Sequence, residues 1–211
     1  MRRIILFGAF ILLIFSMWAA LYPGQVTPVQ RNIIYVHVPS SICALLCFVV
    51  LLVASIGYLI TDKPKWDHLA EASAEVGAVF ATVLNLTGMI FSRAEWGPWW
   101  TPSLRLITSA ILWFLYVVYL ILRNSISNSQ HLRARVCAVF GIIAFIDVPM
   151  VYISARFLPD IHRPNFSFDS PWQRVAFISG IFATMLLAAT LIWIKTDILK
   201  NKAKLEQESI F

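Results

Sequence analysis

Two histidines, His37 and His162, have side chains that can bind a transition metal. A neutral imidazole offers a nitrogen lone pair, and histidine is the commonest metal ligand in proteins. Taken alone, either residue is more often an ordinary interfacial histidine than a ligand. His37 comes two residues before Pro39, and a proline disfavours a helical conformation in the residue before it. We therefore expect His37 to lie at the junction between an extended arm and the start of a helix.

Three tryptophans fall within five residues, at Trp96, Trp99 and Trp100. Gly97 and Pro98 separate the first from the other two. Tryptophans gather at membrane interfaces because an indole is apolar and carries one polar N–H, which explains one or two of the three. Glycine and proline favour a loop over a helix. We expect this loop to present flat aromatic faces to a large, planar, apolar ligand.

Three arginines complete a set of groups that together fit one ligand. Arg105, Arg156 and Arg163 can bind carboxylates, because a guanidinium donates paired hydrogen bonds. Haem iron takes axial imidazoles, the macrocycle stacks on aromatic surface, and the propionates attract guanidinium groups. If one face of the protein carries all these groups, the sequence predicts a haem site. Its members are His37 and His162 as iron ligands, with Trp96, Gly97, Trp99, Trp100 and Arg105 around the macrocycle.

Long apolar segments must position these residues. Of the 211 residues, 59% are hydrophobic and 13% are charged, and the mean hydropathy is +0.76, so the solvent for most side chains must be lipid. A membrane-spanning helix needs about 20 apolar residues. Because the loops are short, we expect consecutive helices to be neighbours. We predict an all-α protein of one membrane domain, residues 1–211, with six spans at 4–22, 38–60, 72–91, 104–122, 136–157 and 175–194.

Lysine and arginine are distributed unequally between the two sides of these spans. The N-terminus, the loops 61–71 and 123–135 and the tail from Lys195 carry eleven of them, against six on the other side. Because cytoplasmic loops carry the excess of basic residues, we expect both termini in the cytoplasm. His68 and His131 then lie in cytoplasmic loops, whereas the candidate ligands, the clustered tryptophans and the three arginines share the outer face.

The fifth span carries an ionisable residue, Asp147, near its middle, with Pro149 two residues later. A charge at that depth is costly and by default indicates function, a buried partner or protonation. Pro149 removes a helical hydrogen bond and should kink the span. We give equal weight to a direct role for Asp147 and to a structural one, in which it is protonated or hydrogen-bonded near the kink. Asn85 of the third span is a candidate polar partner.

Several common kinds of site are missing from the sequence. Cys43, Cys47 and Cys137 lie inside apolar runs without a Cys-x-x-Cys or zinc spacing, so we interpret them as buried packing residues. A Walker motif is also missing, and we expect a protein that binds and hands over a ligand rather than an enzyme. The basic residues do not cluster as a phosphate-binding surface would. We therefore expect the lipid bilayer, and no nucleic acid, as a partner.

Four stretches of the chain resemble one family of membrane proteins. They read IIYVHVP at 33–39, GAVF at 77–80, WGPWWTPSLRLIT at 96–108 and IDVPMVY at 146–152. In this order, and over nearly the whole chain, they are similar to CcmC, the haem-handling family of cytochrome c maturation, which belongs to a wider group with a tryptophan-rich loop.

The resemblance implies a six-span protein of the bacterial inner membrane. It implies that haem b is held as transient cargo at the periplasmic face, between two outer histidines and the tryptophan-rich loop. It further implies delivery of this haem to the periplasmic haem chaperone CcmE, in association with the CcmA–CcmB transporter and the small protein CcmD. By motif, the two histidines of the family correspond to His37 and His162.

One stretch departs from the pattern of that family, in which the loop usually reads WGxWWxWDxR. Pro102 and Ser103 stand at the Trp-Asp pair, whereas Arg105 matches the arginine. If the aspartate caps the fourth helix, Ser103 can replace it, because both residue types are good N-caps. If it orients a partner or contacts haem, the substitution alters haem handling.

Two other classes of membrane protein stay open as alternatives. A b-type electron-transfer protein holds haem permanently, but such proteins usually place histidine pairs inside the helical bundle, and no histidine lies in the middle of a predicted span. A small-solute transporter would use Asp147 in its pathway, but the sequence shows neither inverted repeats nor paired broken helices.

Overall fold

Helices make up almost all of the described part of the chain. The computed structural model describes residues 2–21, 32–127, 129–157, 168 and 170–208. No strand occurs in these ranges, which confirms the predicted all-α class. In chain order the helices are α1 (Arg2–Ala20), α3 (Ile34–Thr61), α4 (Pro64–Trp96), α5 (Leu104–Ser125), α6 (Gln130–Ala144), α7 (Asp147–Arg156) and α8 (Pro171–Glu208).

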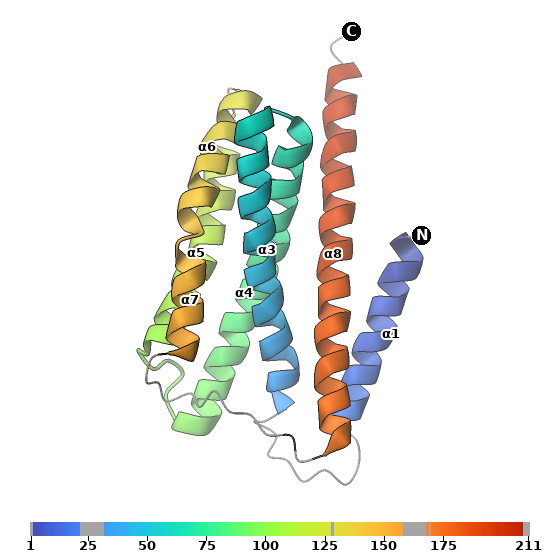
Figure 1. Cartoon of the computed structure of the whole chain (residues 1–211), viewed down its shortest axis with the longest axis vertical. Coiled ribbons are helices and arrows are strands. Elements are labelled where there is room, and N and C mark those ends of the chain that lie inside the picture. Colours follow the sequence, from blue (N-terminus) through green and yellow to red (C-terminus); the bar gives the residue numbers. More distant parts are fainter. Residues whose placement is uncertain (1, 22–31, 128, 158–167, 169, 209–211) are drawn as a thin grey trace.

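Within the described residues, six helical segments are long and apolar enough to cross a membrane. They match the predicted spans in number and order, with α6 and α7 together forming the fifth. The helices run roughly alongside one another, and α1 and α8 lie at one side of the bundle (Figure 1). The chain is therefore a multi-pass membrane protein.

The helices at one end of the bundle continue beyond the apolar segments, so two predicted loops are wrong in extent. Only Asp62 and Lys63 separate α3 from α4, because α4 begins at Pro64, and proline fits the first position of a helix. His68 therefore lies on α4 rather than in a loop, and His131 lies in the first turn of α6. Apolar composition could not predict this, since the extensions carry charged residues that pair between helices.

The helix α8 also continues beyond its apolar segment, at its C-terminal end. Its 38 residues extend over about 57 Å at ~1.5 Å per residue, against ~30 Å for the hydrocarbon core of a bilayer. The final turns of α8 rise beyond the rest of the bundle (Figure 1). The predicted span 175–194 is thus only the central part of this helix.

The prediction that His37 lies at the end of an extended arm is wrong. The helix α3 begins at Ile34 and includes His37, with Pro39 buried inside the helix. The helical start is stabilised by packing: Tyr35 is buried and its ring lies 6.5 Å from that of Phe177 on α8. This contact outweighs the local preference of the residue before a proline.

A break divides the fifth span into α6 and α7, as Pro149 predicts. The helix α6 ends at Ala144 and α7 begins at Asp147. Pro149 has no N–H to donate to the carbonyl four residues earlier, that of Phe145, which instead accepts from Val148 N at 3.0 Å. The predicted kink is therefore a local break in the helical hydrogen bonding, across which Phe145 and Ile146 keep right-handed helical backbone angles.

The main core lies between α3, α4, α5 and α6. It includes Cys43, Cys47 and Cys137, which confirms their interpretation as packing residues. Gly77 on α4 allows close approach of α5, because a Cβ there would lie 2.6 Å from Tyr116 Cζ. The small residues of the third span thus bring helices together, as small residues do in membrane proteins.

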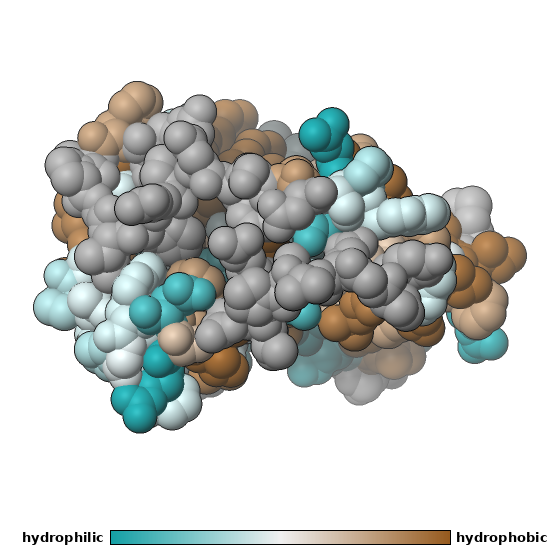
Figure 2. All heavy atoms as spheres, turned by 90° about the horizontal axis from the view of Figure 1, so that it is seen from below, coloured by the Kyte–Doolittle hydropathy of each residue, from teal (hydrophilic) through white to brown (hydrophobic). Residues whose placement is uncertain are grey.

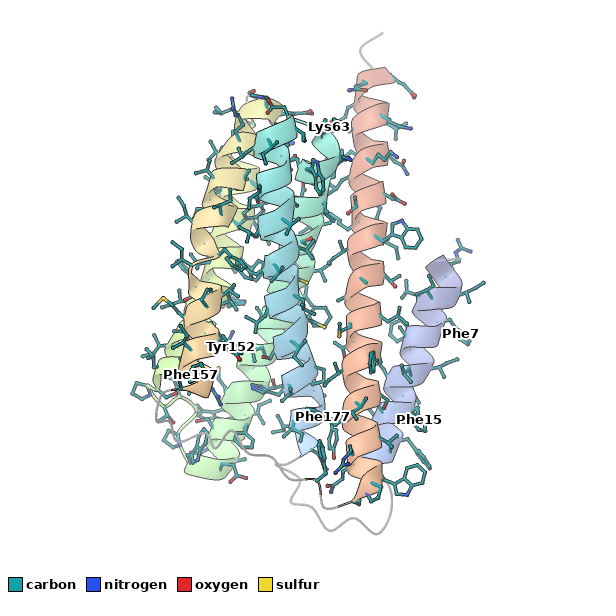
Figure 3. The ribbon with its side chains drawn as sticks, viewed as in Figure 1. Phe7, Phe15, Lys63, Tyr152, Phe157 and Phe177 are labelled. Atoms are coloured by element: carbon teal, nitrogen blue, oxygen red, sulfur yellow. The ribbon has the colours of Figure 1, made fainter. Side chains whose placement is uncertain are left out.

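The helix α1 packs mainly on α8, and not on the next helix in the chain as the short loops led us to expect. Ser16 Oγ donates a hydrogen bond to Ala176 O at 2.7 Å, which joins the two helices. Phe7 and Phe15 lie on the exposed surface of α1 (Figure 3). This surface is apolar, as a lipid-facing helix requires.

Candidate functional site

The two ends of the bundle differ, and the predicted site residues lie at one of them. We call the end at which α4 stops and α5 begins the tryptophan-loop end, and the end at which Asp62 and Lys63 join α3 to α4 the turn end. Lys63 and Phe157 are labelled at the two ends in Figure 3. Viewed end-on, the tryptophan-loop end carries hydrophilic side chains close to hydrophobic ones (Figure 2). A ligand with apolar and charged parts would find both kinds of surface there.

His37 lies at the tryptophan-loop end, between α3 and α4. Its Nδ1 is 3.0 Å from Thr87 Oγ1 on α4. A Cβ at Gly88 would lie only 3.3 Å from His37 Cε1, so the ring lies against the α4 backbone. From Gly88 the helix rises about 12 Å to Trp96, at ~1.5 Å per residue. One helix therefore carries both the imidazole contact and the start of the tryptophan-rich loop.

The tryptophan-rich loop, residues 96–103, is tied to the last turns of α4. Ser92 Oγ, fully buried, donates to Pro98 O at 2.9 Å and lies 3.3 Å from Thr101 Oγ1. Arg93 donates to the carbonyl of Gly97, four residues on. These contacts place the loop over the end of α4 and orient the aromatic rings that it carries.

The three tryptophans of this loop differ in exposure. Trp96 is half-buried, with its ring 5.4 Å from Phe91 in an edge-on arrangement. Trp99 and Trp100 are 56% and 38% exposed, and the guanidinium of Arg93 lies 5.9 Å from the Trp99 ring. An exposed indole under a cation is a surface on which a flat, negatively charged ligand can stack.

Gly97 explains how the chain turns away from α4. Its φ is +93°, a region that other residues rarely adopt, and a Cβ there would meet no atom within 4 Å. Backbone freedom, and not lack of space, is therefore the reason for a glycine at this position. The predicted role of Gly97 beside the ligand stays a prediction.

Ser103 caps α5, as the sequence predicts. Its hydroxyl accepts from Leu106 N at 3.4 Å. Arg105 follows in the first turn of α5, half-buried at the same end of the bundle. Further along, Thr108 Oγ1 lies 3.1 Å from Ser154 Oγ, which ties α5 to α7. The departure from the family pattern at this position therefore keeps a capped helix.

Part of the predicted site lies outside the described residues. His162 and Arg163 belong to the range 158–167, and the side chain of Arg156 is also outside the description. The structure thus brings His37, the tryptophan-rich loop and Arg105 to one end of the bundle. The proposed second iron ligand stays a prediction.

Several residues at this end were missed by sequence reasoning. Thr87 and Gly88 contact the imidazole, and Ser92 and Arg93 hold the loop. The positions of Thr87 and Gly88 depend on how α3 pairs with α4, for which a single sequence has no local signal. Arg93 could have been found, since it lies four residues before Gly97 and close to the tryptophans in sequence.

Asp147 is buried at the break between α6 and α7, only 7% exposed, and its Oδ2 has no hydrogen-bond partner. The candidate partner Asn85 instead donates to Ala81 O at 2.8 Å and Ser109 O at 3.3 Å. The amide of Asn85 is therefore used between α4 and α5. In the described ranges, no group of three or more His, Cys, Asp or Glu residues could hold a metal ion.

The family model of CcmC, described as Heme exporter protein C, matches residues 2–210 of the chain. A ccmC-like mitochondrial protein of cytochrome c biosynthesis from Marchantia polymorpha is 29% identical over 150 residues, which cover 71% of this chain and 62% of the relative. Heme exporter protein C of Escherichia coli K12 is 29% identical over 164 residues, covering 76% and 66%. Heme exporter protein C of Rhodobacter capsulatus is 29% identical over 210 residues, covering 89% and 86%. The chain thus spans about two thirds of the first two relatives and most of the third.

Proposed function

The chain belongs to the Heme exporter protein C family, and from this premise we propose that it binds haem at the tryptophan-loop end and passes it on for the maturation of c-type cytochromes. The observation that carries the proposal is the placement of the His37 imidazole at the end of the bundle where Trp99 and Trp100 are exposed. An imidazole can ligate haem iron, and exposed indoles can stack on the macrocycle.

Each predicted site residue has a role in this proposal. His37 and His162 are the axial ligands, and Arg105 binds a propionate. The rings of Trp96, Trp99 and Trp100 cover the macrocycle, with Gly97 setting the path of the loop. The cargo is haem b, which is bound without a covalent link so that it can be released.

The proposed location is the periplasmic face of a bacterial inner membrane, with both termini in the cytoplasm. The distribution of lysine and arginine supports this orientation, because the turn end and the C-terminal tail carry the larger number. The receiving protein is the haem chaperone CcmE, and the CcmA–CcmB transporter and CcmD are the proposed partners of the complex. The protein itself binds and hands over haem rather than converting it.

Haem binding is tested by an absorption spectrum of the detergent-purified protein produced with ample haem. We expect a Soret band that is reduced or shifted in His37→Ala and in His162→Ala. His131→Ala is the matched control, because His131 is exposed at the turn end, and its spectrum should equal that of the wild type. A wild-type protein without haem would overturn the proposal.

Delivery is tested by mixing the haem-loaded protein with purified CcmE and separating the two. We expect haem to appear on CcmE at the expense of the membrane protein. Haem that stays on the membrane protein, however long the incubation, would instead support the alternative of a permanent b-type electron-transfer site.

Orientation is tested by labelling single cysteines in a variant whose three buried native cysteines are replaced. Glu95→Cys lies at the tryptophan-loop end and Lys63→Cys at the turn end, and both positions are exposed. A membrane-impermeant maleimide added to spheroplasts should label only the former. Labelling of the latter alone would invert the proposed topology.

A further inference from the structure

The hydroxyl of Thr87 already donates its proton within α4. Thr87 Oγ1 lies 2.7 Å from Val83 O and 3.1 Å from Leu84 O, the usual carbonyl partners of a helical threonine. A hydroxyl has one proton and two lone pairs. In the 3.0 Å contact with His37, Thr87 Oγ1 is therefore the acceptor, and His37 donates through Nδ1–H.

This direction of donation defines the tautomer of the imidazole. A neutral imidazole protonated on Nδ1 carries its lone pair on Nε2, and a metal can bind only the nitrogen that has the lone pair. Nε2 is therefore the atom through which His37 can ligate iron. The contact also points Nδ1 into α4, so the opposite edge of the ring faces away from Thr87.

Gly88 gives the ring room to reach Thr87. A Cβ at Gly88 would lie 3.3 Å from His37 Cε1 and 3.9 Å from Nδ1, tighter than ordinary van der Waals contact at the first atom. Because Cε1 lies between the two ring nitrogens, a side chain at this position would displace both. A glycine next to Thr87 thus allows the imidazole to lie directly on the α4 backbone.

The backbone of His37 is held as firmly as its side chain. His37 N donates to Ile33 O at 2.8 Å in the first turn of α3. The helices α3 and α4 pair extensively, which fixes the imidazole relative to Thr87 and Gly88. The ring is therefore placed by two paired helices.

We propose that Thr87 and Gly88 are positioning residues for haem ligation by His37. Thr87 holds the imidazole in the Nδ1–H tautomer and sets the plane of the ring, and Gly88 provides the space for this arrangement. Outer partners of this kind typically change metal affinity 10–100-fold when they are removed. The inference rests on the proposed role of His37 as an iron ligand, but the tautomer itself can be measured without haem.

The first experiment uses the haem-free protein labelled with ¹⁵N-histidine. The nitrogen NMR signals of His37 are assigned by their absence in His37→Ala. At a pH at which the imidazole is neutral, they should show a protonated Nδ1 and an unprotonated Nε2. Thr87→Ser should keep this pattern, whereas Thr87→Val, of similar size but without an acceptor, should lose it. An Nε2–H tautomer in the wild type, or no change in Thr87→Val, would overturn the inference.

The second experiment measures haem affinity and the electron paramagnetic resonance spectrum of the ferric complex. We expect Thr87→Val to bind haem about 10–100-fold more weakly and with altered g-values, because the ring plane is no longer held. Thr87→Ser should restore both. Thr196→Val is the matched control, since Thr196 makes the same kind of bond to Ile192 O, 2.7 Å, on α8, and it should leave both unchanged.

Gly88→Ala provides an independent test that keeps the hydroxyl. We expect a similar loss of affinity, because the methyl group displaces the imidazole from Thr87. Wild-type affinity and g-values in both Thr87→Val and Gly88→Ala would overturn the positioning role while leaving haem binding intact. If the wild type binds no haem, the proposed function fails, and the NMR measurement still decides the tautomer.

Discussion

At the turn end, ion pairs join the helices, whereas at the tryptophan-loop end hydrogen bonds of Ser92 and Arg93 to backbone carbonyls hold the loop that carries the aromatic rings. Arg123 on α5 is only 4% exposed, and it donates to both carboxylate oxygens of Asp67 at 2.8 and 2.6 Å and lies 2.6 Å from Glu71 Oε2. One helical turn further, Glu75 lies 2.7 Å from Lys195 Nζ on α8. Three acidic residues of α4 thus face basic residues of two other helices.

The tryptophan-loop end holds its groups with less buried charge. His37 and Thr87 meet through neutral atoms, Ser92 binds the loop, and Trp99 stays exposed. If haem binds at the tryptophan-loop end, as we propose, the groups that stabilise the fold and those that bind the ligand lie mainly at opposite ends of the bundle. Loss of a buried ion pair at the turn end should therefore lower thermal stability, and loss of the exposed indoles at the tryptophan-loop end should lower haem affinity.

The largest expected effect follows removal of the buried guanidinium. Arg123→Ala leaves Asp67 and Glu71 without their cation, which costs about 3–5 kcal/mol when one partner of a buried ion pair is lost. We expect a large drop in the thermal midpoint in detergent, measured by circular dichroism. Lys202→Ala is the control, because Lys202 is 72% exposed and 4.0 Å from Glu206, so it should have no measurable effect. Equal midpoints in the two variants would remove the case for a stabilising turn end.

Replacement of both exposed tryptophans should lower haem affinity and leave thermal stability unchanged. For Trp99→Leu combined with Trp100→Leu, we expect haem affinity to fall about ten- to a hundredfold, since each lost aromatic contact costs ~0.5–1.5 kcal/mol. The thermal midpoint of the haem-free protein should stay unchanged. Trp18→Leu with Trp193→Leu, at exposed positions on α1 and α8, is the matched pair. If both pairs weaken haem binding equally, the loop has no special role as an aromatic platform.

The cap of α5 should have a smaller effect. Ser103→Ala removes the hydroxyl that accepts from Leu106 N, and loss of such a cap costs about 1 kcal/mol. Ser103→Asp should keep the stability, because both residues cap helices well. The thermal midpoint and haem affinity of the two variants decide the role of this position. Stronger haem binding by Ser103→Asp would mean that an aspartate here does more than cap.

The smallest expected effect is that of Asp147→Asn. Because Oδ2 of Asp147 is buried without a hydrogen bond, the amide breaks no hydrogen bond at that atom, and it keeps the buried side chain neutral. We expect a thermal midpoint, measured by circular dichroism in detergent, equal to or above that of the wild type. Haem affinity should be unchanged. A loss of haem transfer with normal folding would instead give Asp147 a direct functional role, whereas loss of small-solute transport without any effect on haem would favour the transporter alternative.

The spans were predictable because hydropathy is a local property, and the helix break was predictable because Pro149 acts on its own turn. The positions at which the helices begin and end could not be predicted in this way. Asp67 and Lys195 lie outside the apolar segments, and they belong to helices only because partners on other helices neutralise them. The hydropathy of one segment contains no information about an ion pair between two helices, such as that of Glu75 on α4 with Lys195 on α8.

The candidate site divides in the same way. Trp96, Gly97 and Ser103 act through their neighbours in the chain, so the loop and its cap could be anticipated. The contact of His37 with Thr87 joins residues 50 positions apart, and the expectation of an extended arm at His37 failed for the same reason. The burial of Tyr35 against Phe177 on a distant helix decides the backbone there.

The attachment of α1 to α8 has a consequence for how the protein is made. The hydrogen bond from Ser16 to Ala176 joins residues 160 positions apart, and α1 has little contact with any other helix. During synthesis α1 therefore enters the membrane long before its partner exists, and it must wait among lipids while the central helices assemble. A chain interrupted before α8 would lack the helix on which α1 mainly packs.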